Sequence, residues 1–411
     1  MTRSDAAPDG EPRGATDPWA DARARLDALE RAALLRRTRH ADSPPGPVTL
    51  LDGRTLHNFS SNNYLDLAAH PRVTSAAAAA AAASGAGAGG SRLITGSLRV
   101  HAELEAALAD LKGAEDALVF SSGYAANLGV LQALGERADG SRVPVFFDRL
   151  SHACIVDAVR LAGVPWRTFA HNDTARLERL LRGLPATGDG SPAAIVATEG
   201  VFSMDGDTAP LAAIMRLCER HDALLLLDDA HGTGTTGADG RGSAHAAGIA
   251  GHPRLVHMGT LSKALGSQGG FVAGPRVLRE ILVNRARTFV FDTALAPPAA
   301  AASLEALRVM RDEPERVAAL RRNAERLRAR LRDGGIGVPE SPSPIVPVVL
   351  GGADHTLAES ARLLDAGFLV VAIRPPTVPR GTSRLRITLG AGHTTDTVDA
   401  LAEEILRGRR G

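Results

Sequence analysis

The sequence predicts an α/β protein built on a mostly parallel sheet with helices on both faces. Between residues 114 and 273, short apolar runs alternate with helical patterns, which is the order of elements in such a fold. The runs are continuously apolar, as expected for strands that are buried on both faces. Polar clusters follow five of these runs. The expected strands are residues 117–120, 143–147, 193–198, 223–227, 254–258 and 270–273.

Composition excludes several functional classes. The 411-residue chain has a formal net charge of +1 and only 3% aromatic residues, so nothing favours a nucleic acid or an acidic membrane surface as partner. Its two cysteines, Cys154 and Cys218, are too few for a disulfide framework. The polar first 19 residues lack the apolar core of a secretion signal, and no apolar run approaches the ~20 residues of a membrane span. We therefore expect a cytoplasmic protein.

The N-terminal region predicts an arm ahead of the sheet. Residues 1–18 are rich in Asp, Gly, Pro and Arg and are expected to form a disordered leader. Residues 21–39 have leucines spaced for one face of an arginine-rich helix. Residues 48–58, with Asp52-Gly53 in the middle, are typical of a β-hairpin. Together, residues 19–58 are interpreted as an N-terminal helix and hairpin arm.

The C-terminal region predicts a second, smaller α/β domain. A long helical stretch opens at Pro297 and keeps its apolar register up to Gly334. It is expected to bridge a large domain of residues 59–296 and a small domain that completes residues 297–411. The expected strands of the small domain are residues 345–350, 369–373 and 385–389.

The two lysines of the chain call for separate explanations. Of the 47 basic residues, 45 are Arg, and only Lys112 and Lys263 are Lys. An arginine can replace a lysine on a surface, but its guanidinium stays protonated and cannot attack a carbonyl. Lys263 follows a predicted strand and precedes a glycine-rich turn, so we interpret it as a reactive amine. Lys112 ends a predicted amphipathic helix before Gly113 and is interpreted as a surface lysine.

Five polar clusters occupy equivalent positions after the predicted strands. In a parallel sheet the carboxyl ends of the strands meet at one edge, where ligands bind. Chance placement of all five clusters is a poor explanation, so we expect them to form one binding site. The clusters are residues 121–124, 148–152, 199–203, 228–231 and 260–263.

Asp228 follows four leucines and is expected at the mouth of a buried strand, where a carboxylate needs a positive partner. The alternative role for such an Asp is a helix N-cap. If the ligand is pyridoxal 5'-phosphate, Asp228 would keep its ring nitrogen protonated, and His231 could bond the ring hydroxyl. His152 is either a structural residue or a flat ring that stacks on the cofactor.

Two glycine-containing stretches are candidates for phosphate binding. Residues 85–96 are glycine-rich but lack the Gly-Lys-Ser/Thr of a P-loop and precede the sheet. Ser122-Gly123-Tyr124, with backbone amides at the start of a predicted helix, form the better cradle. No His or Cys spacing resembles a zinc site.

Arg374 lies before two prolines, which restrict the backbone and could hold its guanidinium for a bidentate bond to a carboxylate. The alternative is a surface arginine in a proline-rich turn. The sequence by itself leaves both interpretations open.

Seven motifs give the chain a resemblance to the α-oxoamine synthases, a family of fold-type I pyridoxal-phosphate transferases, over about residues 20–408. The motifs are FSSNNYL (59–65), GGSR (89–92), SGYAAN (122–127), DRLSHA (148–153), TEGVFSMDGD (198–207), DDAHGTG (228–234) and AIRPPTVP (372–379). Asn63 and Asp66 depart from the family pattern near the entrance of the site.

The resemblance assigns roles residue by residue. Lys263 resembles the lysine that holds the cofactor, Asp228 the partner of the ring nitrogen, and His152 the residue that stacks on the ring and contacts substrate. The other cofactor-binding residues implied are Ser203, His231 and Thr260, with Gly123 and Tyr124 at the backbone cradle. The other substrate-binding residues implied are Arg36, Asn62, Arg374 and Thr377.

The AIRPPTVP motif favours the branch of the family that acts in biotin biosynthesis. The resemblance then implies a decarboxylating condensation of L-alanine with a pimeloyl thioester, carried by CoA or by a carrier protein, in a homodimer. One alternative is a sister synthase that joins glycine to a short acyl-CoA. Another is a non-catalytic partner subunit, but such subunits lose the lysine that this chain retains as Lys263.

Overall fold

The computed structural model describes residues 17–32, 34–185 and 190–409. The chain forms two units, residues 1–41 and 42–411, which are described separately. In the first unit, α1 (Ala20–Arg31) ends earlier than the predicted limit of residue 39, because the amides of Leu34 and Leu35 both bond the carbonyl of Leu29 and close the helix. Most of the predicted leader lies outside the described residues.

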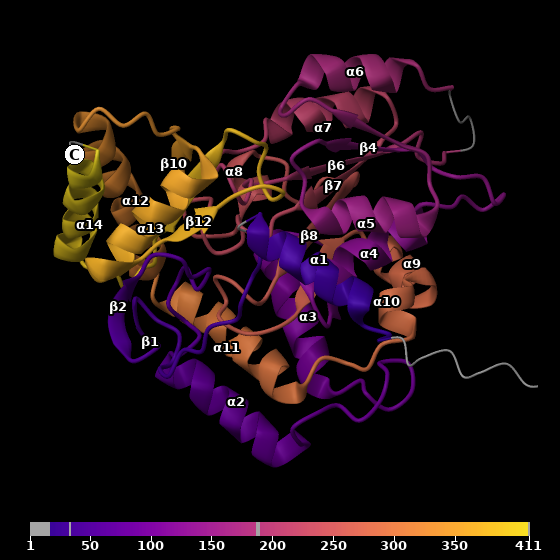
Figure 1. The fold of residues 1–411 in the computed structure, drawn as a ribbon. Coiled ribbons are helices and arrows are strands. Elements are labelled where there is room, and N and C mark those ends of the chain that lie inside the picture. Colours follow the sequence, from indigo (N-terminus) through magenta and orange to yellow (C-terminus); the bar gives the residue numbers. More distant parts are fainter. Residues whose placement is uncertain (1–16, 33, 186–189, 410–411) are drawn as a thin grey trace, which may run out of the picture. The chain divides into compact units, whose positions relative to one another are not determined.

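The second unit alternates strands and helices through most of its length (Figure 1). Its helices are α2 (Pro71–Ser84), α3 (Arg99–Lys112), α4 (Gly123–Leu134), α5 (Ala153–Ala162), α6 (Thr174–Arg182), α7 (Leu211–Arg220), α8 (Ser243–Ala246), α9 (Arg276–Arg285), α10 (Arg287–Val290), α11 (Pro297–Asp312), α12 (Glu315–Asp333), α13 (Ala353–Asp365) and α14 (Thr395–Gly408). Its strands are β1 (Val48–Leu51), β2 (Arg54–Asn58), β3 (Asp116–Phe120), β4 (Val145–Asp148), β5 (Trp166–Phe169), β6 (Ile195–Glu199), β7 (Leu224–Asp228), β8 (Leu255–Thr260), β9 (Gly270–Gly274), β10 (Ile345–Gly351), β11 (Phe368–Leu369), β12 (Val371–Ile373) and β13 (Ser383–Thr388).

The predicted central sheet is confirmed. It has seven strands in the order β3-β9-β8-β7-β6-β4-β5, and all pairs are parallel except those that β9 makes. Successive residues of a strand face opposite sides. Leu226 of β7 therefore packs with α4 and α5, whereas Leu225 and Leu227 pack with α6 and α7. Figure 1 shows the two helical layers on either side of the strands.

Each of the six predicted central strands is present within a few residues of its expected limits. Strand β5 was missed because it is an edge strand whose first three residues are exposed, so its sequence lacks the apolar run used for prediction. The carboxyl ends of β3, β4, β6, β7 and β8 lie at the same edge of the sheet, as expected from the five polar clusters.

The predicted hairpin is confirmed as β1 and β2, which pair antiparallel. Its turn residues, Asp52 and Gly53, both adopt the left-handed backbone conformation that this tight turn requires. β2 also pairs with β11 of the C-terminal region. The predicted strand at residues 369–373 is therefore divided between two sheets, because Val370 separates β11 from β12.

The single long helix predicted from Pro297 is wrong in one respect. The chain forms α11 and α12 instead, with Glu313 and Pro314 between them. Pro314 has no amide hydrogen to donate and its ring obstructs the preceding turn, so the helix breaks there. The apolar spacing nevertheless continues past the break.

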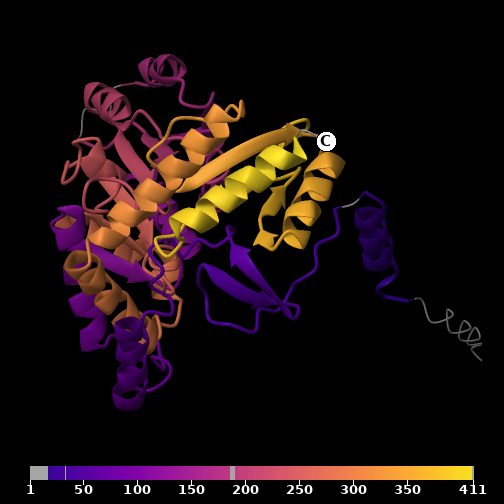
Figure 2. The same cartoon turned by 90° about the vertical axis from the view of Figure 1, so that its left-hand side faces the viewer.

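The C-terminal strands form an antiparallel sheet in the order β10-β13-β12, flanked by α12, α13 and α14 (Figure 2, orange and yellow). The proposed domain limits of 59–296 and 297–411 stay a prediction. In the part of the chain that the structure describes, every helix is too short or too polar to cross a membrane.

Candidate active site

Lys263 lies just after β8, at the edge of the sheet where the polar clusters meet, and it begins a line of hydrogen-bonded side chains. Its Nζ is 2.9 Å from Nε2 of His231, whose Nδ1 is 2.7 Å from the hydroxyl of Tyr64. The Tyr64 hydroxyl donates to Oδ1 of Asn62 at 3.1 Å. Lys263 and His231, which belong to two of the five polar clusters, are thus in direct contact.

Burial sets the protonation of this line. It lowers the pKa of the Lys263 amine, although the nearby carboxyls of Asp228 and Glu199 act in the opposite direction. Burial and the charge of Lys263 hold the pKa of His231 well below its usual range, so the imidazole is neutral. A neutral His231 can accept from Lys263 at Nε2 while Nδ1–H donates to Tyr64, and this tautomer accounts for every bond in the line.

Asp228 ends β7 as a buried carboxylate. Oδ2 accepts from the amide group of Asn127 at 2.8 Å, and Oδ1 accepts from the backbone of Ala230 at 3.1 Å. Burial raises its pKa, while Lys263 favours the ionised form. The helix N-cap alternative does not hold, because the backbone bond to Ala230 closes a turn rather than a helix.

Glu199 is a site residue that sequence reasoning did not single out. It is paired with Asp228 in the register of the parallel strands β6 and β7, so two buried carboxyl side chains are neighbours. Oε2 accepts from the amide of Ser203 at 3.3 Å, whereas the buried Oε1 has no partner among the described residues. Burial and the proximity of Asp228 raise the pKa of Glu199 well above its usual range. The signal in the sequence was a charged residue at the end of an otherwise apolar strand.

His152 lies after β4 and caps α5, with Nδ1 accepting the backbone N–H of Cys154 at 3.3 Å. The Cys154 thiol is 3.0 Å from the same nitrogen and accepts from Asn127 at 3.1 Å. One buried cysteine therefore connects the support of His152 to the residue that holds Asp228. His152 itself is exposed, and its role as the residue that stacks on a bound ring stays a prediction.

The predicted phosphate cradle is the first turn of α4, where the Ser122 hydroxyl accepts from the amide of Ala125 at 3.0 Å. Gly270 of β9 runs so close that a Cβ there would lie 2.5 Å from the nitrogen of Gly123. Thr260 adjoins the same turn, and its hydroxyl donates to the carbonyl of Gly269 at 2.9 Å. The side chain of Tyr124 points elsewhere, because its hydroxyl donates to Asp157 at 2.6 Å.

Arg386 of β13 is the second site residue that the sequence analysis missed. This buried arginine donates from Nε to the carbonyl of Ser203 at 2.5 Å and approaches Oδ1 of Asn62 at 3.3 Å. Its charge also contributes to the lowered pKa values of Lys263 and His231. An arginine within the apolar run of residues 385–389 was the available signal.

The remaining predicted substrate residues lie further along the C-terminal sheet or outside this unit. Arg374 and Thr377 form a turn after β12, in which the amide of Thr377 donates to the carbonyl of Arg374 at 3.1 Å. β12 neighbours β13, the strand that carries Arg386. Arg36 belongs to the unit of residues 1–41, and its role stays a prediction.

These groups fit pyridoxal 5'-phosphate. A lysine with a lowered pKa suits the aldehyde, the buried carboxylate of Asp228 suits a protonated ring nitrogen, and the first turn of α4 suits the phosphate. The buried Oε1 of Glu199 in the same site has no partner among the described residues, so it can accept a hydrogen bond from a bound group.

Comparisons with known proteins agree with this interpretation. The family model of class I and II aminotransferases matches residues 54–405. The 8-amino-7-oxononanoate synthase of Methylobacterium radiotolerans is 49% identical over 383 residues, which cover 93% of this chain and 96% of the relative.

Among solved structures, the serine palmitoyltransferase of Sphingomonas wittichii has a TM-score of 0.87 and 31% identity, covering 96% of this chain and 98% of that one. A serine palmitoyltransferase variant from S. paucimobilis, with a bound PLP–myriocin aldimine, has a TM-score of 0.86 and 29% identity, covering 95% and 97% of the two chains. The chain therefore belongs to the class I and II aminotransferase family with a fold-type I, pyridoxal-phosphate-dependent architecture, and within it to the 8-amino-7-oxononanoate synthases.

Proposed function

We propose that this protein condenses L-alanine with a pimeloyl thioester to give 8-amino-7-oxononanoate, carbon dioxide and the free thiol, in biotin biosynthesis. The observation that carries the proposal is the contact of Lys263 with a neutral His231, beside the buried carboxyls at the ends of β6 and β7. The high identity to curated 8-amino-7-oxononanoate synthases supports the choice of reaction.

When bound, pyridoxal 5'-phosphate supplies an aldehyde and a protonated ring that takes up the electron pair released at the amino-acid α-carbon. Asp228 holds the proton at the ring nitrogen, because its carboxylate is fixed by Asn127 and Ala230. Lys263 provides the amine that carries the cofactor and then removes the α-proton of alanine. Its lowered pKa leaves a larger share of neutral amine available for this step.

Two arginines are assigned to two carboxylates. Arg386 is bonded to Asn62, the last residue of the line that begins at Lys263, and its charge acts on Lys263, so Arg386 and Asn62 are assigned to the alanine carboxylate that later leaves as carbon dioxide. Arg374 and Thr377, in the turn after β12, are assigned to the distal carboxylate of the pimeloyl chain, because the prolines of this turn restrict the backbone that carries the guanidinium. Arg36, in the unit of residues 1–41, stays a predicted substrate-binding residue. The acyl donor is pimeloyl-CoA or the same acyl group on a carrier protein.

We also propose a cytoplasmic homodimer. Ile94 is 80% exposed and Leu93 is 48% exposed in a glycine-rich segment, which supports coverage of this surface by a second copy. Sedimentation under assay conditions tests this point, and an active monomer would contradict it.

Product identification by mass spectrometry tests the reaction. Purified protein is incubated with alanine, glycine or serine, each against pimeloyl, acetyl and palmitoyl thioesters. We expect 8-amino-7-oxononanoate from alanine and pimeloyl thioester only. A Lys263→Ala variant is the control and should form no product. Preferred turnover of glycine with an acetyl thioester would indicate the sister synthase instead, and a colourless wild-type protein that fails to bind the cofactor would indicate a non-catalytic subunit.

A further inference from the structure

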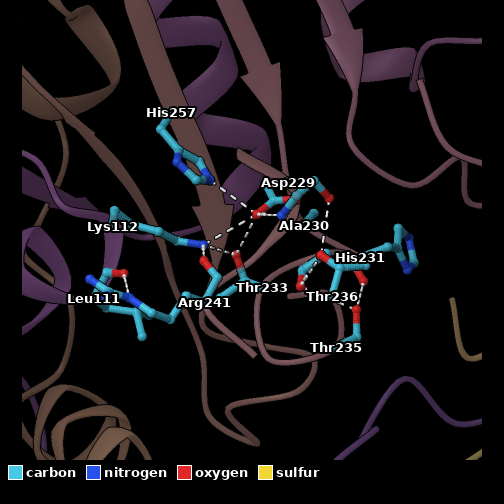
Figure 3. A network of polar contacts seen from close by, with 12 residues as sticks. Leu111, Lys112, Asp229, Ala230, His231, Thr233, Thr235, Thr236, Arg241 and His257 are labelled. Carbon is cyan, nitrogen blue, oxygen red and sulfur yellow. Dashed lines mark hydrogen bonds and ion pairs between the residues drawn. The ribbon is translucent and has the colours of Figure 1, made fainter. Parts of the chain in front are cut away.

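Lys112 contradicts the prediction of a surface lysine, because it is only 1% exposed. It ends α3, and three acceptors surround its ammonium group (Figure 3). These are Oδ2 of Asp229 at 3.2 Å, the hydroxyl of Thr233 at 2.9 Å and the carbonyl of Arg241 at 2.9 Å. Each of the three ammonium hydrogens therefore has a partner.

Asp229 is the anion of this buried cluster, and it too is fully satisfied. Besides Lys112, it accepts from Nε2 of His257 at 3.0 Å and from the amide of Ser243 at 3.2 Å. Burial opposes ionisation, but Lys112 and His257 together hold the pKa of Asp229 below its usual range. The pair is an ion pair with no solvent exposure of either side chain.

The backbone is shaped around this carboxylate. Three glycines approach it so closely that a Cβ would lie 1.9 Å from Asp229 Oδ1 at Gly232, 2.5 Å from Oδ1 at Gly200 and 2.1 Å from Oδ2 at Gly242. Gly242 also has a φ of 107°, which only glycine adopts readily. Chain segments after β6, after β7 and before α8 thus meet at one buried carboxylate.

The cluster lies directly behind the site. Asp228 and Asp229 are consecutive, so their side chains leave opposite faces of the chain: Asp228 contacts Asn127 in the site, and Asp229 contacts Lys112 on the other side. The carbonyl of Asp229 accepts from Gly232 and Thr233, which closes the turn that carries His231. Figure 3 shows Lys112 and His257 on one side of this turn and the His231 ring on the other.

We propose that Lys112 is a positioning residue for the cofactor site: by holding Asp229 it fixes the turn from Asp228 to Thr233 and so aims Asp228 and His231. The chain retains a lysine here because a compact ammonium offers three hydrogens that diverge from one point, matching the three acceptors, whereas a planar guanidinium needs more space and a different arrangement. Both lysines of this arginine-rich chain are then explained by chemistry, Lys263 by reactivity and Lys112 by shape.

Four variants test the proposal by cofactor affinity, measured without substrates. Lys112→Met and Lys112→Arg are expected to raise the dissociation constant for pyridoxal 5'-phosphate at least tenfold and to shift the visible absorbance of the bound cofactor. Lys112→Met/Asp229→Asn removes both charges, so it should recover much of the lost melting temperature but not the affinity. Thr233→Val removes one acceptor without creating a buried charge and should weaken binding by a smaller factor, about two- to fivefold.

Arg362→Met is the matched control. Arg362 pairs with Glu359 and Glu404 between α13 and α14, so its loss should lower the melting temperature while leaving the cofactor affinity and spectrum unchanged. If the Lys112 variants behave like this control, with a dissociation constant within twofold of wild type and an unshifted cofactor absorbance, Lys112 is structural only and the proposal fails. If the single Lys112 variants do not fold, unchanged affinity in the double variant and in Thr233→Val would overturn it equally. The acyl specificity of the enzyme does not enter these measurements.

Discussion

At the scale of single residues, the site shows two pairs of like groups whose members have different surroundings. Asp228 and Glu199 are neighbouring buried carboxyls, but both oxygens of Asp228 accept hydrogen bonds, from Asn127 and Ala230, whereas Glu199 accepts at Oε2 from Ser203 and its Oε1 has no partner among the described residues. Two carboxyls this close cannot both ionise at little cost. We therefore assign the charge to Asp228 and the proton to Glu199.

This assignment predicts the pH dependence of a Glu199→Gln variant without cofactor. The folded pKa of Glu199 is raised, so its contribution to stability is fully present below the unfolded pKa of ~4.3 and is lost as the pH rises through the folded pKa. Glutamine stays neutral and loses nothing. The free energy of unfolding of the variant should therefore increase relative to that of wild type as the pH rises from 5 to 9, measured by denaturant titration. A constant difference across that range would show that Glu199 is not the protonated partner.

The two arginines predict separable kinetic defects. Arg386→Ala should raise the KM for alanine by about ten- to a hundredfold, because a charge-assisted bond contributes ~1.5–3 kcal/mol and each ~1.4 kcal/mol is a factor of ten. Arg374→Ala should raise the KM for the pimeloyl thioester by a similar factor and leave that for alanine unchanged. Steady-state titration of each substrate against each variant checks this. Loss of alanine affinity in Arg374→Ala alone would exchange the two roles.

At the scale of elements, the ends of strands and the starts of helices form the cofactor site together. The first turn of α4 can lie against β9 only because residue 270 has no side chain, since a Cβ would come within 2.5 Å of backbone atoms of Ser122 and Gly123. That contact fixes the distance between the predicted phosphate cradle and the sheet that carries Asp228 and Lys263.

Gly270→Ala should therefore move the start of α4 and weaken cofactor binding by at least tenfold, with a smaller effect on overall stability. The measurement is the dissociation constant for pyridoxal 5'-phosphate, alongside the melting temperature of the protein without cofactor. Gly337→Ala is the control, because a Cβ there meets no atom within 4 Å. Equal affinity in the two variants would show that α4 tolerates the shift.

At the scale of the whole molecule, the shifted pKa values of three histidines predict a maximum of the free energy of unfolding near neutral pH. Burial lowers the pKa values of His257 and His393 to about 4. Their contribution is present above the unfolded pKa of ~6.5 and is lost as the pH falls toward 4, by up to about 3 kcal/mol each. For His171, burial is outweighed by Asp148 and Asp207, which raise its pKa to about 10.

The contribution of His171 has the opposite sign: it is present below pH ~6.5 and is lost as the pH rises toward 10. We expect the free energy of unfolding of the protein without cofactor to peak near pH 6.5 and to fall on both sides. His171→Asn should flatten the alkaline side, while the exposed His355→Asn should leave the curve unchanged. Unfolding titrations between pH 4 and 10 measure both effects, and an unaltered alkaline slope in His171→Asn would refute the assignment.

Much of the fold and site follows from local sequence. Continuous apolar runs predict buried strands, polar clusters after them predict a common edge, and the scarcity of lysine singles out Lys263. These signals are local because a strand that is buried on both faces is continuously apolar, whichever strands it pairs with. The break at Pro314 could also have been predicted from the sequence, since proline disrupts a helix interior whatever surrounds it. It was missed because apolar spacing continues past it.

Other features depend on contacts between segments that are distant in sequence. Lys112 is buried only because Asp229 lies opposite it, 117 residues later. Arg386 enters the site only because β13 reaches Ser203 and Asn62, and the pKa of Glu199 is raised by burial and by Asp228, its neighbour on the paired strand β7. For Lys112 and Arg386, the cost of burying a charge is met by partners that the local sequence does not contain, whereas the buried Glu199 is held neutral by a like charge on the neighbouring strand. Local sequence was thus sufficient to predict the strands and their common edge and to single out Lys263 as a candidate, whereas long-range contacts determine which charged residues are buried and which groups they bind.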